Sequence, residues 1–191
     1  MIDSNTTVVA RVHPWNIIDE AFEILNSDNP EKDTEKAIAL IHESGVHTVM
    51  AEIYIDGIHV KKDVERARVI LEYGVKTGCP YSKLFLASFY EHGAGGLEKD
   101  HAKSYELISS TIDSVFCGLQ LARCFELGIG VKVNKEMSFQ ILSALDDEIL
   151  ESRGMHAECL ALARHYEEGI GTKKDTKAAK FYELLSFKIK G

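Results

Sequence analysis

The chain contains little proline and no long apolar run. Only three of its 191 residues are proline, so few positions interrupt a helix and long helical segments are permitted over most of the chain. No stretch approaches the ~18 consecutive apolar residues of a membrane-spanning helix. The first seven residues lack the basic and apolar segments of a secretory signal. We therefore expect a protein without a membrane span, located in the cytoplasm.

Basic charge is also scarce. The 22 Lys and Arg residues are outnumbered by 30 Asp and Glu residues, which gives a formal net charge of −8. Nucleic acids and anionic membranes attract proteins through basic surfaces, so neither is expected as a partner. The 45% hydrophobic content is that of a globular protein rather than a disordered one.

Cysteines are few and irregularly placed. The four cysteines, at positions 79, 117, 124 and 159, form neither a Cys-x-x-Cys pair nor the His/Cys spacing of a zinc site. They are interpreted as buried thiols that behave as small hydrophobic side chains. No metal and no cofactor is indicated, and the absence of a disulfide framework agrees with a reducing compartment.

What the chain does contain is a short pattern repeated four times. In each copy an alanine is followed three residues later by an aromatic residue and six residues later by a glycine. The glycines, at 57, 93, 128 and 169, are 36, 35 and 41 residues apart. Each copy continues with an Asp or Asn and, four positions on, a small residue; these pairs are Asp63/Ala67, Asp100/Ser104, Asn134/Ser138 and Asp175/Ala179.

Each part of the pattern has a structural meaning. The alanine and the aromatic residue lie on one side of a helix, and a glycine just beyond can adopt the left-handed conformation that ends it. The Asp or Asn then caps the next helix by accepting hydrogen bonds from its free N–H groups. Every copy therefore predicts a helix, a tight turn and a second helix.

This template predicts five helical hairpins. Their helices are expected at 15–26 with 33–44, 46–56 with 63–77, 80–92 with 100–112, 114–127 with 134–149, and 154–168 with 175–189. The first hairpin keeps only the capping phrase at Asp33 and Ala37, as expected of a degenerate terminal unit. The extra residues near 146–154 are expected to form an extended or looped junction.

The predicted organisation has three parts. Residues 1–14 form a loose N-terminal arm and residues 15–44 the degenerate hairpin. Residues 45–191 form the repeats, with units at about 45–79, 80–113, 114–152 and 153–191.

The phrase Leu-Ala-x-x-Tyr-x-x-Gly-x-Gly, followed by Asp and a small residue, resembles the Sel-one-like repeat, a relative of the tetratricopeptide repeat. The resemblance covers about 45–190. It implies an all-α, right-handed superhelix, or solenoid, of about five helix-turn-helix units whose first helices line a concave groove. It also implies a non-enzymatic adaptor or scaffold that binds a protein or peptide.

Positions that face this groove in related repeats identify candidate binding residues. By position they are Tyr81, Leu84, Ser88, Glu91, Phe116, Leu119, Arg123, Glu126, Arg164 and Glu167. Aromatic and Arg side chains are frequent at interface hot spots. Leu84 and Leu119 are alternatively ordinary core residues between repeats. The two Arg residues either bind a partner's carboxylate as a fork or pair within their own helices with the Glu three residues on.

Two short motifs suggest other chemistry but lack essential features. In His42-Glu43-x-x-x-His47 the histidines are five residues apart, a rotation of about 140° that places them on different sides of a helix. The glycines at 93–96 lack the Lys-Ser/Thr ending of a phosphate-binding loop.

Two alternative functions remain open at this point. One is a bacterial immunity or antitoxin-like protein that neutralises a cationic toxin through the net charge of −8. The other is a small hydrolase that uses Cys124 and His165, which occupy the same position in adjacent repeats and still need an orienting group and an oxyanion site. The chain is expected to be a monomer or a homodimer.

Overall fold

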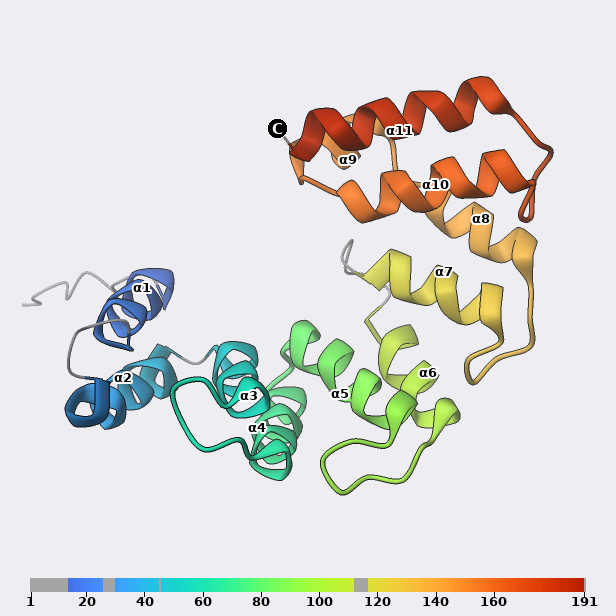
Figure 1. Ribbon diagram of the computed structural model, residues 1–191. Coiled ribbons are helices and arrows are strands. Elements are labelled where there is room, and N and C mark those ends of the chain that lie inside the picture. The colour runs from blue at the N-terminus through green and yellow to red at the C-terminus, as the bar shows by residue number, and fades with distance from the viewer. Residues whose placement is uncertain (1–13, 26–29, 45, 112–116, 191) are drawn as a thin grey trace, which may run out of the picture. The chain divides into compact units, whose positions relative to one another are not determined.

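The computed structural model describes the chain except for residues 1–13, 26–29, 45, 112–116 and 191, and the described residues contain helices and no strand (Figure 1). The helices are α1 (Pro14–Leu25), α2 (Pro30–Ser44), α3 (His47–Asp56), α4 (Val64–Lys76), α5 (Pro80–His92), α6 (His101–Ser109), α7 (Gly118–Leu127), α8 (Lys135–Ser143), α9 (Asp147–Ser152), α10 (His156–Glu168) and α11 (Thr176–Lys190). The chain divides into two compact units, Met1–Thr77 and Gly78–Gly191. The all-α prediction is confirmed, and the predicted arm lies outside the described residues apart from Pro14.

The first unit contains two helical hairpins. Helix α1 pairs with α2 and α3 pairs with α4, while α2 also packs against α3. Ala37 and Ile41 of α2 are fully buried. Helix α2 begins at Pro30, three residues before the predicted start, so Asp33 lies within the helix rather than in front of it. Proline is favourable in a first helical turn because its missing N–H is not needed there.

The second unit contains three hairpins that share their cores. Helices α5 and α6, α7 and α8, and α10 and α11 form the pairs, and α6 contacts α7 as α8 contacts α10 (Figure 1). Leu121 of α7 packs with Ala87 and Ile108 of the preceding hairpin, whereas Leu142 of α8 packs with Leu162 of the following one. Each hairpin therefore buries its apolar side against its neighbours, as in other helical repeats.

The turns within the hairpins follow the predicted pattern. The first glycine of each copy adopts a left-handed conformation with φ of 70 to 75°; these are Gly57, Gly93, Gly128 and Gly169. The Asp or Asn side chain accepts a hydrogen bond of 2.9 to 3.0 Å from the N–H three residues on, at Asp63, Asp100, Asn134 and Asp175. The N–H of the same residue donates to the carbonyl of the repeat's aromatic residue at 2.8 to 2.9 Å in all four copies. This bond joins the end of one helix to the start of the next.

The second glycine of the turn has a separate role, at the contact between hairpins. A Cβ at Gly130 would lie 2.0 Å from the carbonyl oxygen of His101, and one at Gly171 would lie 1.9 Å from that of Lys135. His101 and Lys135 each begin the second helix of the preceding hairpin. Only glycine permits the turn to approach that helix so closely.

The junction between the last two hairpins was predicted incorrectly. Helix α8 ends at Ser143 rather than near 149, and the expected loop contains the six-residue helix α9. Asp146 caps α9, because its Oδ1 accepts a 2.7 Å hydrogen bond from the Ile149 N–H. The fully buried Leu150 anchors the helix to the core, and the acidic first turn suits the positive end of the helix dipole.

Candidate protein-binding surface

Two bidentate ion pairs join the first helices of successive hairpins in the second unit. Arg123 of α7 donates to both carboxylate oxygens of Glu91 on α5, at 3.0 and 2.5 Å. Arg164 of α10 makes the same two-pronged contact with Glu126 of α7, at 2.8 and 2.7 Å. Each Arg stands one residue after its repeat's alanine, and each Glu stands four residues after the alanine of the preceding repeat. The interaction is therefore itself a repeated feature.

The two members of each pair differ in exposure. The Glu91 and Glu126 side chains are 12% and 13% exposed, whereas those of Arg123 and Arg164 are 45% and 44% exposed. Hydrogen bonding from the Arg residues lowers the pKa of both glutamates below its ordinary value, and the glutamates raise the pKa of both Arg side chains. Both pairs are consequently ionised at neutral pH, with their positive member toward solvent.

A small cavity of about 280 Å³ lies between α7 and α10. Four of the predicted groove residues line it: Leu119, Arg123, Glu126 and Arg164. The remaining lining residues are Ala122, Leu127, Leu142, Ala161 and His165. The sequence pattern thus brings charged and apolar candidates from two hairpins to one place.

His165 supports one side of this cavity. The residue is fully buried; its Nδ1 lies 3.0 Å from the Ile170 carbonyl oxygen and its Nε2 lies 3.4 Å from Oε2 of Glu126. Glu126 therefore lies between Arg164 and His165. Both neighbours contribute to lowering its pKa, Arg164 more than His165.

The remaining predicted residues have different environments. Tyr81 and Ser88 on α5 and Glu167 on α10 are exposed. Leu84 and Leu119 are half-buried and pack against the hydrophobic clusters of the second unit. Phe116 lies outside the described residues.

Of the two alternatives for the Arg residues, pairing with the Glu three residues on is not the one in the structure, because Arg123 contacts Glu91 and Arg164 contacts Glu126 across hairpins. Leu127, which the sequence pattern does not identify, also lines the cavity and is 58% exposed. It directly follows Glu126, but an isolated exposed leucine gives no signal in a sequence.

The buried thiol of Cys124 does not match the chemistry of a nucleophile. Its side chain is 1% exposed, and burial, with a smaller contribution from the charge of Glu91, raises its pKa to about 11. A reactive cysteine needs a lowered pKa, because the thiolate is the attacking form. The geometry at Cys124 gives no support to the hydrolase alternative.

The two histidines of the motif His42-Glu43-x-x-x-His47 lie on different helices. His42 is near the end of α2 and His47 begins α3, and both line an apolar cavity of about 240 Å³. The His47 ring is 5.2 Å from that of Tyr73, and burial together with the charge of His42 lowers the pKa of His47. Among the residues that the structure describes, no three His, Cys, Asp or Glu side chains are grouped as metal ligands. No described helix is long and apolar enough to cross a membrane.

The fold and this surface define an α-helical repeat protein whose hairpins stack through glycine turns, capped helices and shared cores. The model of the Sel1 repeat family matches residues 48–72, 80–111, 119–143 and 159–184, which is more than half of the chain. The chain belongs to the Sel1 repeat family. Proteins of this family are generally protein-interaction modules. None of the curated proteins matches the chain.

Two solved structures have the same fold. One is c5321, a protective antigen of uropathogenic Escherichia coli strains that displays an SLR fold; it aligns with a TM-score of 0.68 at 19% identity, over 92% of this chain and 38% of its own. The other is a Sel1 repeat protein from Oxalobacter formigenes, with a TM-score of 0.69 at 19% identity, over 91% of this chain and 70% of its own. This chain thus spans well under half the length of the first and about two thirds of the second.

Proposed function

We propose that the chain is a non-enzymatic adaptor or scaffold that binds a protein or peptide along its first helices, on the surface formed by α5, α7 and α10. The observation that carries the proposal is the cavity between α7 and α10, which is lined by both Arg123 and Arg164 together with apolar side chains. Arg and large apolar residues are typical anchors of protein interfaces.

The two Arg side chains suit recognition of a carboxylate. Each guanidinium uses one N–H of each terminal nitrogen for its Glu partner, so the remaining N–H groups can donate to a carboxylate of a bound chain. Because the Glu partner already fixes each Arg, less side-chain entropy is lost on binding. Leu119 and Leu127 supply apolar contact beside these donors.

The net charge and the free cysteines of the chain also support this proposal and a cytoplasmic location. The net charge of −8 favours a partner that is cationic overall, with a side-chain or terminal carboxylate entering the cavity. None of the four cysteines is in a disulfide, which supports action in the cytoplasm. No contact within the described residues favours the immunity or the hydrolase alternative over this proposal.

The test is a double substitution of Arg123 and Arg164 by Ala, followed by affinity capture from a native lysate and mass spectrometry. The variant is expected to lose the main captured partner while its helical circular dichroism stays unchanged, because exposed ion pairs contribute only about 0–1 kcal/mol each to stability.

The matched control replaces Lys132 and Lys173 by Ala. Both are exposed residues of the turns, so the same two charges are removed away from the cavity. Capture by this control should equal that of the wild type. Full retention of the partner by the Arg variant would contradict binding at this surface.

A further inference from the structure

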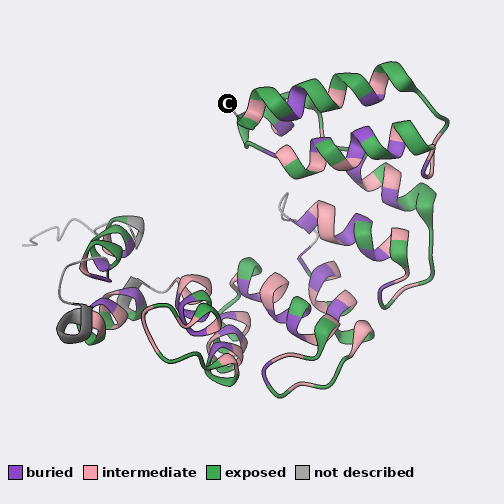
Figure 2. Cartoon of the chain, in the orientation of Figure 1, coloured by how far each residue is buried: buried purple, intermediate pink, exposed green. Residues whose placement is uncertain are grey.

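The outer side of α11 is apolar where the corresponding helices of the same unit, α6 and α8, are polar. Counted from the capping residues Asn134 and Asp175, Phe181 and Leu184 occupy the positions of Gln140 and Ser143 on α8. The same positions of α6 carry Glu106 and Ser109. Phe181, Leu184 and Phe187 are nevertheless 48%, 61% and 69% exposed, and Figure 2 shows the outward side of α11 mostly as exposed residues. A contiguous apolar patch of this kind on a folded protein marks an interaction surface.

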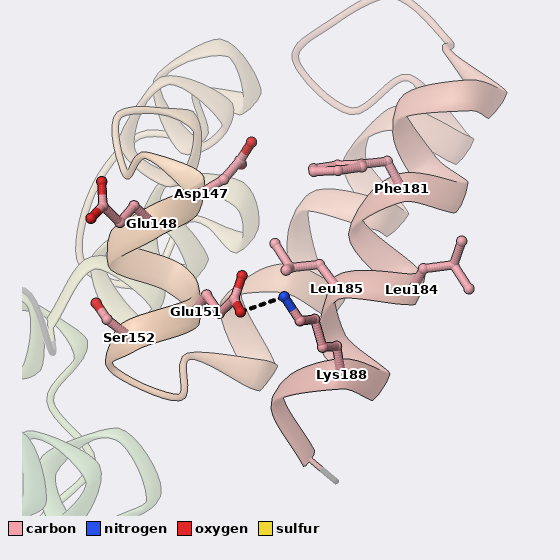
Figure 3. A pocket seen from close by; sticks show the side chains of 8 residues that line it. All are labelled: Asp147, Glu148, Glu151, Ser152, Phe181, Leu184, Leu185 and Lys188. Atoms are coloured by element: carbon pink, nitrogen blue, oxygen red, sulfur yellow. Dashed lines mark hydrogen bonds and ion pairs between the residues drawn. The ribbon is translucent and has the colours of Figure 1, made fainter.

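Helix α9 adds a second wall beside this patch. A groove of about 750 Å³ lies between α9 and α11, and its lining includes Asp147, Glu151, Phe181 and Leu184. In Figure 3, Phe181 turns toward α9 whereas Leu184 turns away from it. The apolar surface therefore begins inside the groove and continues onto the outward side of α11.

The two walls carry opposite charge. Helix α9 holds three carboxylates, Asp147, Glu148 and Glu151, and no basic residue. Each of the exposed lysines Lys177, Lys180 and Lys188 of α11 is four residues from Phe181 or Leu184, so the lysines share one side of the helix with the apolar patch. Within one molecule Lys188 reaches across the groove to Glu151, at 2.5 Å.

An acidic wall beside a basic, apolar helix is complementary to itself under two-fold rotation. In a symmetric dimer the same patch serves both copies, so α11 of each copy meets α9 of the other. The lysines of one copy then face the carboxylates of the other, and each apolar patch covers its counterpart. A foreign partner would have to supply both features, a basic helix and apolar side chains, which a second copy already has.

We propose that the chain forms a symmetric homodimer through α9 and α11, with Phe181, Leu184 and Phe187 at its centre and Lys177 and Lys180 opposite the α9 carboxylates of the second copy. This interface goes beyond the proposed function, because it uses second helices and the inserted helix rather than the surface around Arg123 and Arg164.

The first experiment measures self-association of the full chain by sedimentation equilibrium. The wild type is expected to show a concentration-dependent dimer. The double variant Phe181→Glu, Leu184→Glu is expected to weaken the dimer at least about tenfold, as loss of central apolar contacts does. The matched control Gln140→Glu, Ser143→Glu adds the same charge at the same positions of α8 and should dimerise like the wild type. Circular dichroism verifies that each variant is folded.

A second experiment tests the charge complementarity directly. The variants Lys177→Glu, Lys180→Glu and Glu148→Lys, Glu151→Lys should each dimerise at least about tenfold more weakly than the wild type, because like charges then face one another. A mixture of the two variants should restore association, since each supplies the sign that the other lacks. These substitutions leave Arg123 and Arg164 intact, so partner capture at the first-helix surface should persist.

Three results would overturn the homodimer. One is a wild type that stays monomeric at high micromolar concentration. Another is a dimer that Phe181→Glu, Leu184→Glu leaves intact. The third is a monomeric wild type that binds an amphipathic Leu/Lys helical peptide but not its Leu/Glu counterpart, because the groove would then accept a foreign cationic helix.

Discussion

Helices α8 and α11 occupy the same place in successive hairpins, yet they differ on two of their sides. Both begin after a capping Asn or Asp, and both place a small residue, Ser138 or Ala179, at the buried fourth position. On α8, Phe139 lies edge-to-face against Tyr166 of the next hairpin at 5.2 Å, and Leu142 is 1% exposed.

The equivalent residues of α11, Lys180 and Glu183, are both exposed. The side of α11 that corresponds to the inter-hairpin contact of α8 is thus polar, while its outer side is apolar. Residues that close and cap a hairpin are alike in both helices because every hairpin needs them. On the other sides, the residue types differ because the two helices have different neighbours.

The largest expected effect comes from the turns, which the two hairpins share. Gly130→Ala and Gly171→Ala each place a Cβ about 2 Å from a backbone carbonyl oxygen of the preceding hairpin, so each should lower the free energy of unfolding by about 3 kcal/mol or more. Chemical denaturation followed by circular dichroism measures the change.

Gly154 provides the matched control for the turn glycines. Gly154 also has a positive φ, of +65°. A Cβ added there would meet no atom closer than a side-chain carbon of Ile189, 3.9 Å away. Gly154→Ala should therefore cost only the left-handed backbone strain, about 1–2 kcal/mol. Equal losses at Gly154 and Gly171 would show that the close approach between hairpins has no energetic importance.

The next effect is expected at the position where α8 and α11 diverge most. Leu142→Ala removes a nearly fully buried side chain and should cost about 2–5 kcal/mol. Glu183→Ala, at the same position of α11, should change stability by no more than about 0.5 kcal/mol, because the side chain is exposed. Comparable costs at the two positions would mean that α11 is covered on this side in solution.

The sequence predicts the parts of the fold that depend on single residues. A glycine with positive φ and an Asp that caps a helix each act locally, so Gly128 and Asp100 could be interpreted without knowledge of their neighbours. Helix α9 had such signals as well, in Asp146 and the acidic residues after it, but a six-residue helix is too short to be stable without the burial of Leu150.

The binding surface was only partly predictable for a related reason. Arg123 has one glutamate three residues away and another 32 residues away. A local pattern favours the near one, because residues three apart are neighbours on a helix. The stacking of hairpins instead brings Glu91 to Arg123. The sequence shows this pairing only when the repeats are aligned and each Arg is compared with the Glu of the preceding repeat. The role of each Glu thus depends on the tertiary structure.

The smallest expected effect concerns the two ion pairs between first helices, Arg123–Glu91 and Arg164–Glu126. These pairs repeat from one hairpin to the next, whereas the outer sides of α8 and α11 differ. The pKa values of Glu91 and Glu126 are lower in the folded chain than the ordinary 4.5, so the folded state binds fewer protons than the unfolded state in the acid range. Their stabilisation is present above about pH 4.5 and is lost as the pH falls through the lowered values. With the Arg partners nearly half exposed, each pair should contribute about 0.5 kcal/mol.

Denaturation at neutral and acid pH can isolate this contribution. Glu91→Gln, Glu126→Gln keeps the side-chain shape but removes the titration, so the double variant should be less stable than the wild type at neutral pH and should lose less stability on acidification. Glu106→Gln, Glu136→Gln removes two exposed carboxylates of α6 and α8 that form no ion pair among the described residues, and its acid response should follow the wild type. If both variants respond alike, the ion pairs add nothing to the stacking of first helices. The repetition of the Arg–Glu pairs would then have to be explained by the proposed binding function rather than by the stability of the repeat.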